Sequence, residues 1–433
     1  MSTFALRMGT SGGAEMQFGA VARVQGYASA DPKSVVYRQI SIPISDVLTS
    51  CVDVPAGRYV IQVILPSGRM LSEERQVGEG DLVSVVFANP ARRDWLGWQD
   101  YAAATPRSDL PAPSTVELSR LGRIGRRMQS LPYLDRIFGA VMGAGSGETA
   151  NVDKTLPGTP VVSIACSPTS SDENAWTALA QSPPVLGPNE ATFAPVRKEG
   201  PLALYDLRLK KLLEGRPWVV VAMDDALEIV SLPFDRSGAP PPSAELLVDQ
   251  RAAFAVCRSS LVVRDAESAP LLAFLGRGNA EPALEIVHGL SRAGSSLNRG
   301  QGLLPFTFCA AAYIRLMNDE TAPPEQSSLE EAAELFPWLP DAAVIRTQAM
   351  IRNGGDRDDI VRALRSAYER GVPYFSAGVQ HLREAMGLFS AADGEVAAMA
   401  SAVAMVASRM DPGKPFTALR YSRRAQASAL PQA

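Results

Sequence analysis

The stretch "PWVVVAMDDALEIVSLPF", residues 217–234, sets two runs of apolar, mainly β-branched residues on either side of two aspartates. β-Branched residues favour strands and adjacent aspartates favour a turn. We therefore predict a β-hairpin that turns at Asp224-Asp225. Because "TPVVSIAC" before it and "AAFAVCRSSLVVR" after it also have strand composition, we expect a β-rich domain over residues 158–262.

Short strands are also predicted nearer the N-terminus. In "RYVIQVIL" Tyr59, Ile61 and Val63 fall on one face, which is typical of a half-buried strand. "VVYRQISIPI" and "GEGDLVSVVF" have similar composition. This spacing of short strands predicts an antiparallel β-sandwich over residues 31–110. Residues 1–30, rich in Gly, Ala and Ser, are expected to form an N-terminal arm or one short strand.

From residue 263 the apolar residues recur at helical spacing. In "DRDDIVRALRSAYERG" a stripe of Ile360, Leu364 and Ala367 ends at a glycine, and "DAAVIRTQAMIRNGG" ends in Asn353-Gly354. Consecutive helices joined by short turns predict an α-helical hairpin array over 263–410, followed by a C-terminal tail over 411–433. The fold class is therefore α+β multidomain.

A corner in this array, "LFPWLPDAAVIR" (335–346), places a tryptophan between two prolines. Pro337 ends one helix and Pro340 can begin the next, because the first turn of a helix tolerates a missing N–H. Trp338 is then expected to be an apolar wedge that fixes the angle between the helices. The alternative is an exposed platform on which a ligand stacks.

Residues 111–157 are expected to form amphipathic helices and a linker. In "STVELSRLGRIGRRMQSL" the apolar residues share one helical face, and Arg120, Arg123, Arg126 and Arg127 lie opposite. Such a helix can bind a protein partner or an anionic membrane. Alternatively, its apolar face docks on a β domain and its arginines are merely solvated. The polar stretch "SGETANVDKTLPGT" follows as the expected domain boundary.

A second candidate surface is "ARRDWLGWQD" (91–100), which contains Arg92, Arg93, Trp95 and Trp98. Arginine and tryptophan are favoured anchors at protein interfaces. Two tryptophans three residues apart can equally plug the end of a domain. Both readings stay open for this segment.

The sequence offers no catalytic residues. There are two histidines, and His288-Gly289 resembles the His-Gly of caspase-like peptidases, yet the one downstream cysteine, Cys309, lies in an apolar helix that disfavours a thiolate. HExxH and Walker motifs are absent. We expect a protein that is not an enzyme and that has no cofactor and no metal site.

Net charge, cysteine spacing and the N-terminal sequence limit the expected classes of partner and the expected cellular compartment. The net charge of −4 argues against nucleic-acid binding. The four cysteines form no CxxC pair, as expected for a reducing compartment. The N-terminus lacks a basic segment followed by an apolar core, so no signal peptide is predicted. These features favour a cytoplasmic protein with a protein partner.

Several segments resemble accessory and effector proteins of bacterial conflict (anti-phage) systems associated with caspase-like peptidases. They are "VPAGRYVIQVILPSGR", "VGEGDLVSVVF" and "DWLGWQ", then "GLLPFTFCAAAYIRLMN", "WLPDAAVIRTQAMIR", "ERGVPYFSAGVQHL" and "DPGKPFTALR". Those proteins join a sandwich resembling the carboxypeptidase regulatory module to a C-terminal helical (TPR-like) region. No peptidase domain is recognisable in this chain, so the resemblance carries over no catalytic residue.

The resemblance implies a non-enzymatic scaffold, regulator or proteolytic target, coupled to a caspase-like protease. If proteolysis is the switch, the cut is expected near Arg120–Arg127 or within Gly147–Pro157. One alternative is an effector, released by cleavage, whose segment "LPYLDRIFGAVMGAG" perturbs membranes. A cryptic hydrolase is the other.

Overall fold

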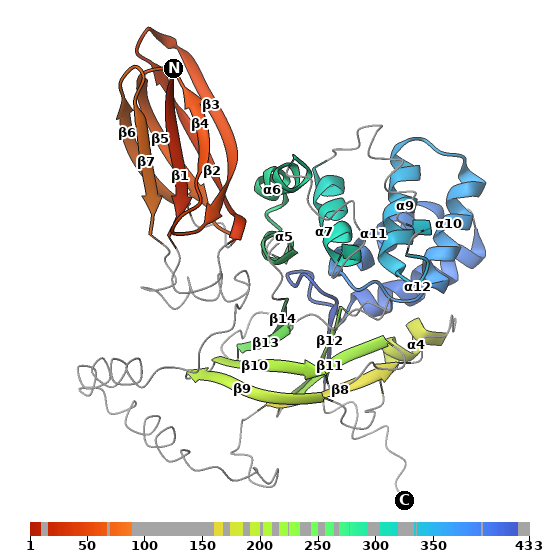
Figure 1. Cartoon of the computed structure of the whole chain (residues 1–433). Helices are drawn as coiled ribbons and strands as arrows, with labels where there is room; N and C mark the ends of the chain where they lie inside the picture. Colours follow the sequence, from red (N-terminus) through yellow and green to blue (C-terminus); the bar gives the residue numbers. More distant parts are fainter. Residues whose placement is uncertain are drawn as a thin grey trace, which may run out of the picture.

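The computed structural model describes 17 stretches of the chain, which together carry all the elements discussed below. They are residues 1–9, 16–66, 70–88, 160–167, 174–184, 191–199, 202–209, 216–223, 225–233, 244–249, 256–263, 268–276, 278–292, 304–318, 333–334, 336–390 and 393–422. The protein is an α+β multidomain chain with an N-terminal β-sandwich, two further sheets and a set of helices (Figure 1).

Seven strands make the N-terminal sandwich. They are β1 (Ser2–Met8), β2 (Met16–Ala28), β3 (Asp31–Ile44), β4 (Ser50–Val54), β5 (Gly57–Ile64), β6 (Met70–Val77) and β7 (Leu82–Phe87). The order is β4-β1-β3-β2-β5-β6, with β7 beside β1. Because β1 meets β3 only at Met8 and Ile44, the sheet curls into two layers, β4-β1-β7 and β3-β2-β5-β6. Buried Phe4, Tyr59 and Ile61 lie between them.

Residues 1–30 differ from the expected arm, because they contain both β1 and β2. In β1 Phe4, Leu6 and Met8 are fully buried, and in β2 the small residues Ala20 and Ala22 occupy core positions. Small side chains blur the alternation by which strands are recognised in a sequence. Most pairings are antiparallel, as predicted, while β1 pairs in parallel with β7 and, at one residue pair, with β3. The predicted limit at residue 110 lies outside the described residues.

Two four-stranded sheets occupy the second β-rich region. One, in the order β15-β12-β11-β8, contains β8 (Val161–Ser167), β11 (Arg216–Ala222), β12 (Ala226–Ser231) and β15 (Ala418–Ser422). The other, in the order β14-β13-β10-β9, contains β9 (Ala191–Glu199), β10 (Leu202–Leu209), β13 (Ala244–Asp249) and β14 (Ser259–Val263). A short helix that the sequence did not predict, α4 (Asn174–Gln181), follows β8.

The predicted hairpin is confirmed and lies at the centre of this region. β11 pairs with β12 up to Ala222 and Leu227, and Met223 N donates to Ala226 O at 2.8 Å. β11 is buried on both faces: Val219 packs toward the β9–β14 sheet and helices α5–α7, while Trp218 packs toward helices α9–α12. The hairpin therefore joins two hydrophobic cores.

The C-terminal helices form the predicted hairpins. They are α5 (Ser268–Gly276), α6 (Ala280–Arg292), α7 (Leu304–Met317), α9 (Pro340–Arg352), α10 (Arg357–Glu369), α11 (Ser376–Phe389) and α12 (Gly394–Ala407). Gly354 and Gly371 have φ of +67° and +92° just after α9 and α10, as expected of glycines that end helices. Asp356 caps α10 by accepting from Asp358 N at 2.9 Å. The predicted stripe on α10 is buried.

The corner before α9 packs as a wedge. Trp338 is half-buried and makes edge contacts with Phe306 of α7 and with Tyr374, at ring-centroid distances of 6.1 and 6.3 Å. Pro340 is the first residue of α9. The tryptophan thus sets α7, α9 and the segment before α11 against one another, which favours the wedge over an exposed platform.

The predicted C-terminal tail is corrected by β15. This strand pairs antiparallel with β12, with Ala418 opposite Val230, and its Leu419 and Tyr421 are buried in the core shared with α9–α12. A five-residue strand has little periodicity of its own, and its partner lies far away in the sequence. Nothing local therefore marks it as a strand.

The sandwich contacts helices α5 and α6 through β2, and α6 also through β3. Arg23 Nη2 lies 2.6 Å from Glu281 Oε1 of α6, and Asn279 Nδ2 donates to Pro66 O at 2.8 Å. Val21 and Ile64, neighbours on β2 and β5, add apolar contact to the core that includes α5 and α6.

Candidate functional site: two buried carboxylates

The partner-binding or cleavage region predicted from the sequence cannot be placed. Arg92, Trp95, Trp98, Arg120, Arg123, Arg126 and Arg127 all lie outside the described residues, as do the segment 131–145 and the linker. The described part of the chain contains buried carboxylates that the sequence analysis did not predict as site residues.

The two residues of the caspase-like comparison are both described. Cys309 lies on α7 and is fully buried; burial, and then the nearby Asp341, raise the pKa of its thiol well above the usual value. His288, on α6, is half-buried, with Nδ1 3.8 Å from Glu285 Oε2. Since a cysteine nucleophile must be a thiolate, burial makes Cys309 unsuited to that role.

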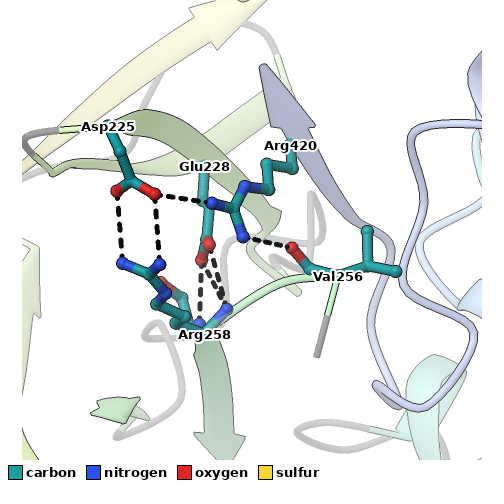
Figure 2. Close-up of polar contacts among 6 residues, drawn as sticks. Asp225, Glu228, Val256, Arg258 and Arg420 are labelled. Atoms are coloured by element: carbon teal, nitrogen blue, oxygen red, sulfur yellow. Dashed lines mark hydrogen bonds and ion pairs between the residues drawn. The ribbon is translucent and has the colours of Figure 1, made fainter. Parts of the chain in front are cut away.

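Among the described residues, two carboxylates have no exposed surface, and the first is Glu228 of β12. Its Oε1 and Oε2 accept from Arg258 N at 2.9 and 3.0 Å, and Oε2 also accepts from Ser259 N at 2.9 Å (Figure 2). Both oxygens therefore receive backbone N–H groups where the chain enters β14. Hydrogen bonds from backbone amides to a carboxylate compensate for the loss of its hydration.

Asp225, Arg258 and Arg420 form an ion-pair network next to the contact between Glu228 and the start of β14. Asp225 accepts two hydrogen bonds from the Arg258 guanidinium, at 3.1 and 3.2 Å, and one from Arg420 Nη2 of β15 at 2.9 Å (Figure 2). Arg420 Nη1 also donates to Val256 O at 3.1 Å. The network links the β11–β12 turn, the start of β14 and the C-terminal strand.

Asp411 is the third acid that binds residues 256–260. Asp411 Oδ2 accepts from Cys257 N at 2.9 Å, and Lys414 Nζ donates to Ser260 Oγ at 2.7 Å. The backbone N–H groups of Cys257, Arg258 and Ser259 are thus all bound by carboxylates. We call Asp225, Glu228, Arg258, Asp411 and Arg420 the strand clamp.

The second buried carboxylate is Asp341, in the first turn of α9. Its Oδ1 accepts from Tyr313 Oη at 2.8 Å and from Phe375 N at 3.3 Å, and its Oδ2 accepts from Tyr374 N at 2.6 Å. Asp341 therefore joins three elements, namely α7, α9 and the segment that leads into α11. Gly378 of α11 packs so closely here that an added Cβ would lie 2.6 Å from Oδ1.

Burial dominates the electrostatics of Asp341. Complete burial raises the pKa of its carboxyl from 3.8 to about 6, against the opposing effects of the Tyr374 and Tyr313 hydrogen bonds and the Arg216 charge. The Tyr313 ring stacks on His381 of α11 with ring centroids 5.8 Å apart. Burial lowers the pKa of His381.

Arg216 of β11 supplies the neighbouring positive charge. Its Nη2 donates to Ser231 Oγ and to Pro373 O, each at 2.9 Å, and its guanidinium lies over the rings of Trp218 and Tyr374. Cation–π contact of this kind stabilises a desolvated arginine. The side chain therefore ties the central hairpin to the segment that Asp341 holds.

This geometry favours an architectural role for both carboxylates. All four carboxylate oxygens of Glu228 and Asp341 accept hydrogen bonds from the protein itself. Within the described stretches, no three His, Cys, Asp or Glu side chains group to hold a metal ion. Nor does any helix described there have the length and apolarity needed to cross a membrane.

Sequence reasoning passed over both acids because each looked ordinary in its local context. Asp341 follows Pro340 in a first helical turn, where an acid normally complements the helix dipole. Glu228 lies in the predicted strand "ALEIVS". The signal in each case is a single acid enclosed by apolar residues, "WLPDAAVI" and "ALEIV", since a charge on a buried element requires partners.

Comparison with known proteins gives a match over the C-terminal part of the chain. A protein-family profile described as the Y4kD C-terminal domain matches residues 270–430, less than half of the chain. The matched part includes Asp341, Asp411 and β15, but not Glu228, Asp225 or β12. No curated protein and no solved structure matches the chain.

Proposed function

We propose that this protein is a non-enzymatic, cytoplasmic scaffold that acts by binding another protein. The observation that carries the proposal is that every carboxylate oxygen of Glu228 and Asp341 accepts a hydrogen bond from a donor of the same chain. Groups used in this way lock the helical hairpins to the sheets instead of offering reactive side chains. A rigid helical array supplies a preformed surface for a partner, which reduces the ordering cost of binding.

The proposed partner is a caspase-like protease of a prokaryotic defence system, with this chain as scaffold, regulator or substrate. The support is the sequence resemblance in the sandwich and in the helical segments. The Arg92–Trp98 and Arg120–Arg127 segments are the proposed partner-binding or cleavage region. In the sequence these segments lie between the sandwich strands and residue 160, so a cut there would break the covalent link between the two parts.

Proteolysis tests the substrate form of this proposal. The full chain is incubated with a caspase-like peptidase from the same genome, and the products are measured by intact-mass spectrometry. We expect cleavage within Arg120–Arg127 or Gly147–Pro157, and loss of the first cut when the four arginines are changed to glutamine. A chain that stays intact would exclude the substrate role.

The scaffold form is tested by affinity purification of the tagged full chain from its native host. A stoichiometric protein partner is expected. The matched variants His288→Ala and Cys309→Ala should keep both the partner and the cellular phenotype, provided that their melting temperatures show folded protein. Loss of the phenotype in folded variants, without loss of the partner, would favour a hydrolase instead.

A further inference from the structure

Among the strands that the structure describes, β7 has a neighbour on one edge only, and that neighbour is β1. Asp81 O accepts from Thr3 N at 2.8 Å, and Phe87 O accepts from Gly9 N at 3.0 Å. Because successive residues of a strand direct their backbone groups to opposite edges, the N–H and C=O groups of Leu82, Ser84 and Val86 point away from β1.

The other edges of the sandwich are protected against further pairing, and β7 is not. Natural sheets protect their edges with charges, prolines or short strands. The two strands at the ends of the order given above carry charges: β6 has Glu73, Glu74 and Arg75, and β4 has Asp53. β7, with the sequence LVSVVF, has no charge and no proline, and the side chains of Leu82 and Val86 are 72% and 44% exposed.

The sequence of β7 is nearly symmetric about Ser84. Valines flank this serine on both sides, and Leu82 and Val86 follow at equal distances. If two copies of β7 pair antiparallel about Ser84, each Leu82 meets a Val86 and the two serines meet each other. All six of these residues direct their backbone groups to the shared edge, and no charged side chains meet. A twofold interface requires this kind of self-complementarity.

We propose that a second copy of this chain docks on the β7 edge and joins the two β4-β1-β7 layers into one continuous sheet. The pairing supplies three hydrogen-bonded residue pairs and therefore about six backbone hydrogen bonds. This contact is smaller than a standard stable interface. The dimer is accordingly concentration-dependent, with a dissociation constant on the order of 10 µM. This self-association is independent of the partner proposed above.

Sedimentation equilibrium of the full chain tests the proposal. The apparent mass should rise from 46.2 kDa toward twice that value as the concentration passes from roughly 1 to 100 µM. Ser84 is exposed, so Ser84→Lys and Ser84→Glu should each fold, as circular dichroism can verify. Each variant alone should remain a monomer, because two like charges then face each other across the twofold axis.

An equimolar mixture of the two variants distinguishes this register from a general loss of association. Opposite charges then face each other, and the dimer should return at least to the wild-type level. Ser72→Lys on the β6 edge is the matched control and should dimerise as the wild type does. A wild-type chain that stays at 46.2 kDa throughout, a dimeric Ser84→Lys, or a mixture that stays monomeric would each overturn the proposal.

Discussion

The sandwich and the remainder of the molecule are built on different plans. The sandwich, residues 1–88, encloses a core made from its own strands. From residue 160 onward the sheets and helices share two cores, and the last strand, β15, completes a sheet whose other strands precede all the hairpin helices (Figure 1). The segment 270–430, which a family profile matches, is therefore not self-contained, because its strand β15 pairs with β12 outside the segment.

The polar contacts of the two regions also differ in their burial. On the sandwich, Arg58 and Glu74 form an ion pair whose side chains are 75% and 51% exposed. We call the described sheets and helices from residue 160 onward the interlocked region. There Glu228 and Asp341 are fully buried and accept hydrogen bonds from backbone amides. Exposed pairs contribute little, whereas a buried donor that loses its acceptor is costly. Single polar substitutions should therefore damage the interlocked region far more than the sandwich.

The largest effect is expected from ending the chain after Met410. This removes β15 with Leu419 and Tyr421, exposes the edge of β12 and deletes two members of the strand clamp. We expect the interlocked region to lose cooperative folding while the sandwich keeps its own. Hydrogen exchange read by mass spectrometry should show unprotected amides from 160 onward and protected amides in 1–88.

A chain ended after Ser422 is the control, because it keeps β15 and should retain wild-type protection throughout. Wild-type protection in the shorter chain would show that the helices fold without the strand. Loss of protection in the sandwich as well would show that the two regions fold as one.

Removing the Asp341 carboxylate should have the next largest effect. Asp341→Ala leaves Tyr313 Oη and the amides of Tyr374 and Phe375 without their acceptor, and we expect it to lower the free energy of unfolding by about 3–5 kcal/mol. Tryptophan fluorescence reports the transition, because residues 1–88 contain no tryptophan and Trp176, Trp218 and Trp338 lie in the interlocked region. Asp358→Ala, at an exposed site on α10, is the control and should change stability by less than about 0.5 kcal/mol.

The sequence predicted the parts of the fold that are decided locally. The α10 stripe, the glycines after α9 and α10, and the β11–β12 hairpin each combine periodicity with a stop signal, and the structure confirms them. Residues 1–30 were expected to hold at most one short strand and contain two, and β15 was not predicted, because pairing with distant strands defines these elements. Small residues in β2 and the brevity of β15 leave no local pattern.

The two buried carboxylates were missed for a similar reason. Whether an acid in a first helical turn faces solvent or a core depends on elements that arrive later in the chain. Asp341 is buried by α7 and by the segment before α11, and Glu228 by the chain entering β14. A sequence shows that such an acid has apolar neighbours along the chain, but not which distant amides will bind it.

A pair of glycines on α11 gives the next test of how tightly the interlocked region is packed. A Cβ at Gly378 would lie 2.5 Å from Tyr313 Oη and 2.6 Å from Asp341 Oδ1, whereas a Cβ at Gly387 meets nothing within 4 Å. Gly378→Ala should therefore cost about 1–3 kcal/mol. Gly387→Ala should stabilise the protein by about 0.5–1 kcal/mol. Chemical denaturation followed by tryptophan fluorescence compares them, and equal effects would contradict the close packing.

A smaller effect is expected from the titration of Asp341. Its pKa is about 6 in the folded protein and 3.8 as a reference, so the folded state binds the proton more tightly. The resulting stability is complete below the reference value and is lost as pH rises through about 6. Between pH 7.5 and 5 the wild type should gain about 1 kcal/mol relative to Asp341→Asn. His381 is present in both proteins, so the difference in their denaturation free energies isolates Asp341, and parallel pH profiles would refute the assignment.

The smallest effect is expected at the contact between the two regions. Arg23 on β2 pairs with Glu281 on α6, whose side chain is 68% exposed. A double-mutant cycle of Arg23→Ala and Glu281→Ala should give a coupling of about 0.2–1 kcal/mol. Since salt screens exposed charges, the coupling should shrink further in about 1 M salt. A coupling of several kcal/mol would mean that the sandwich depends on the helices for its stability, and the contrast between an independent sandwich and an interlocked remainder would then fail.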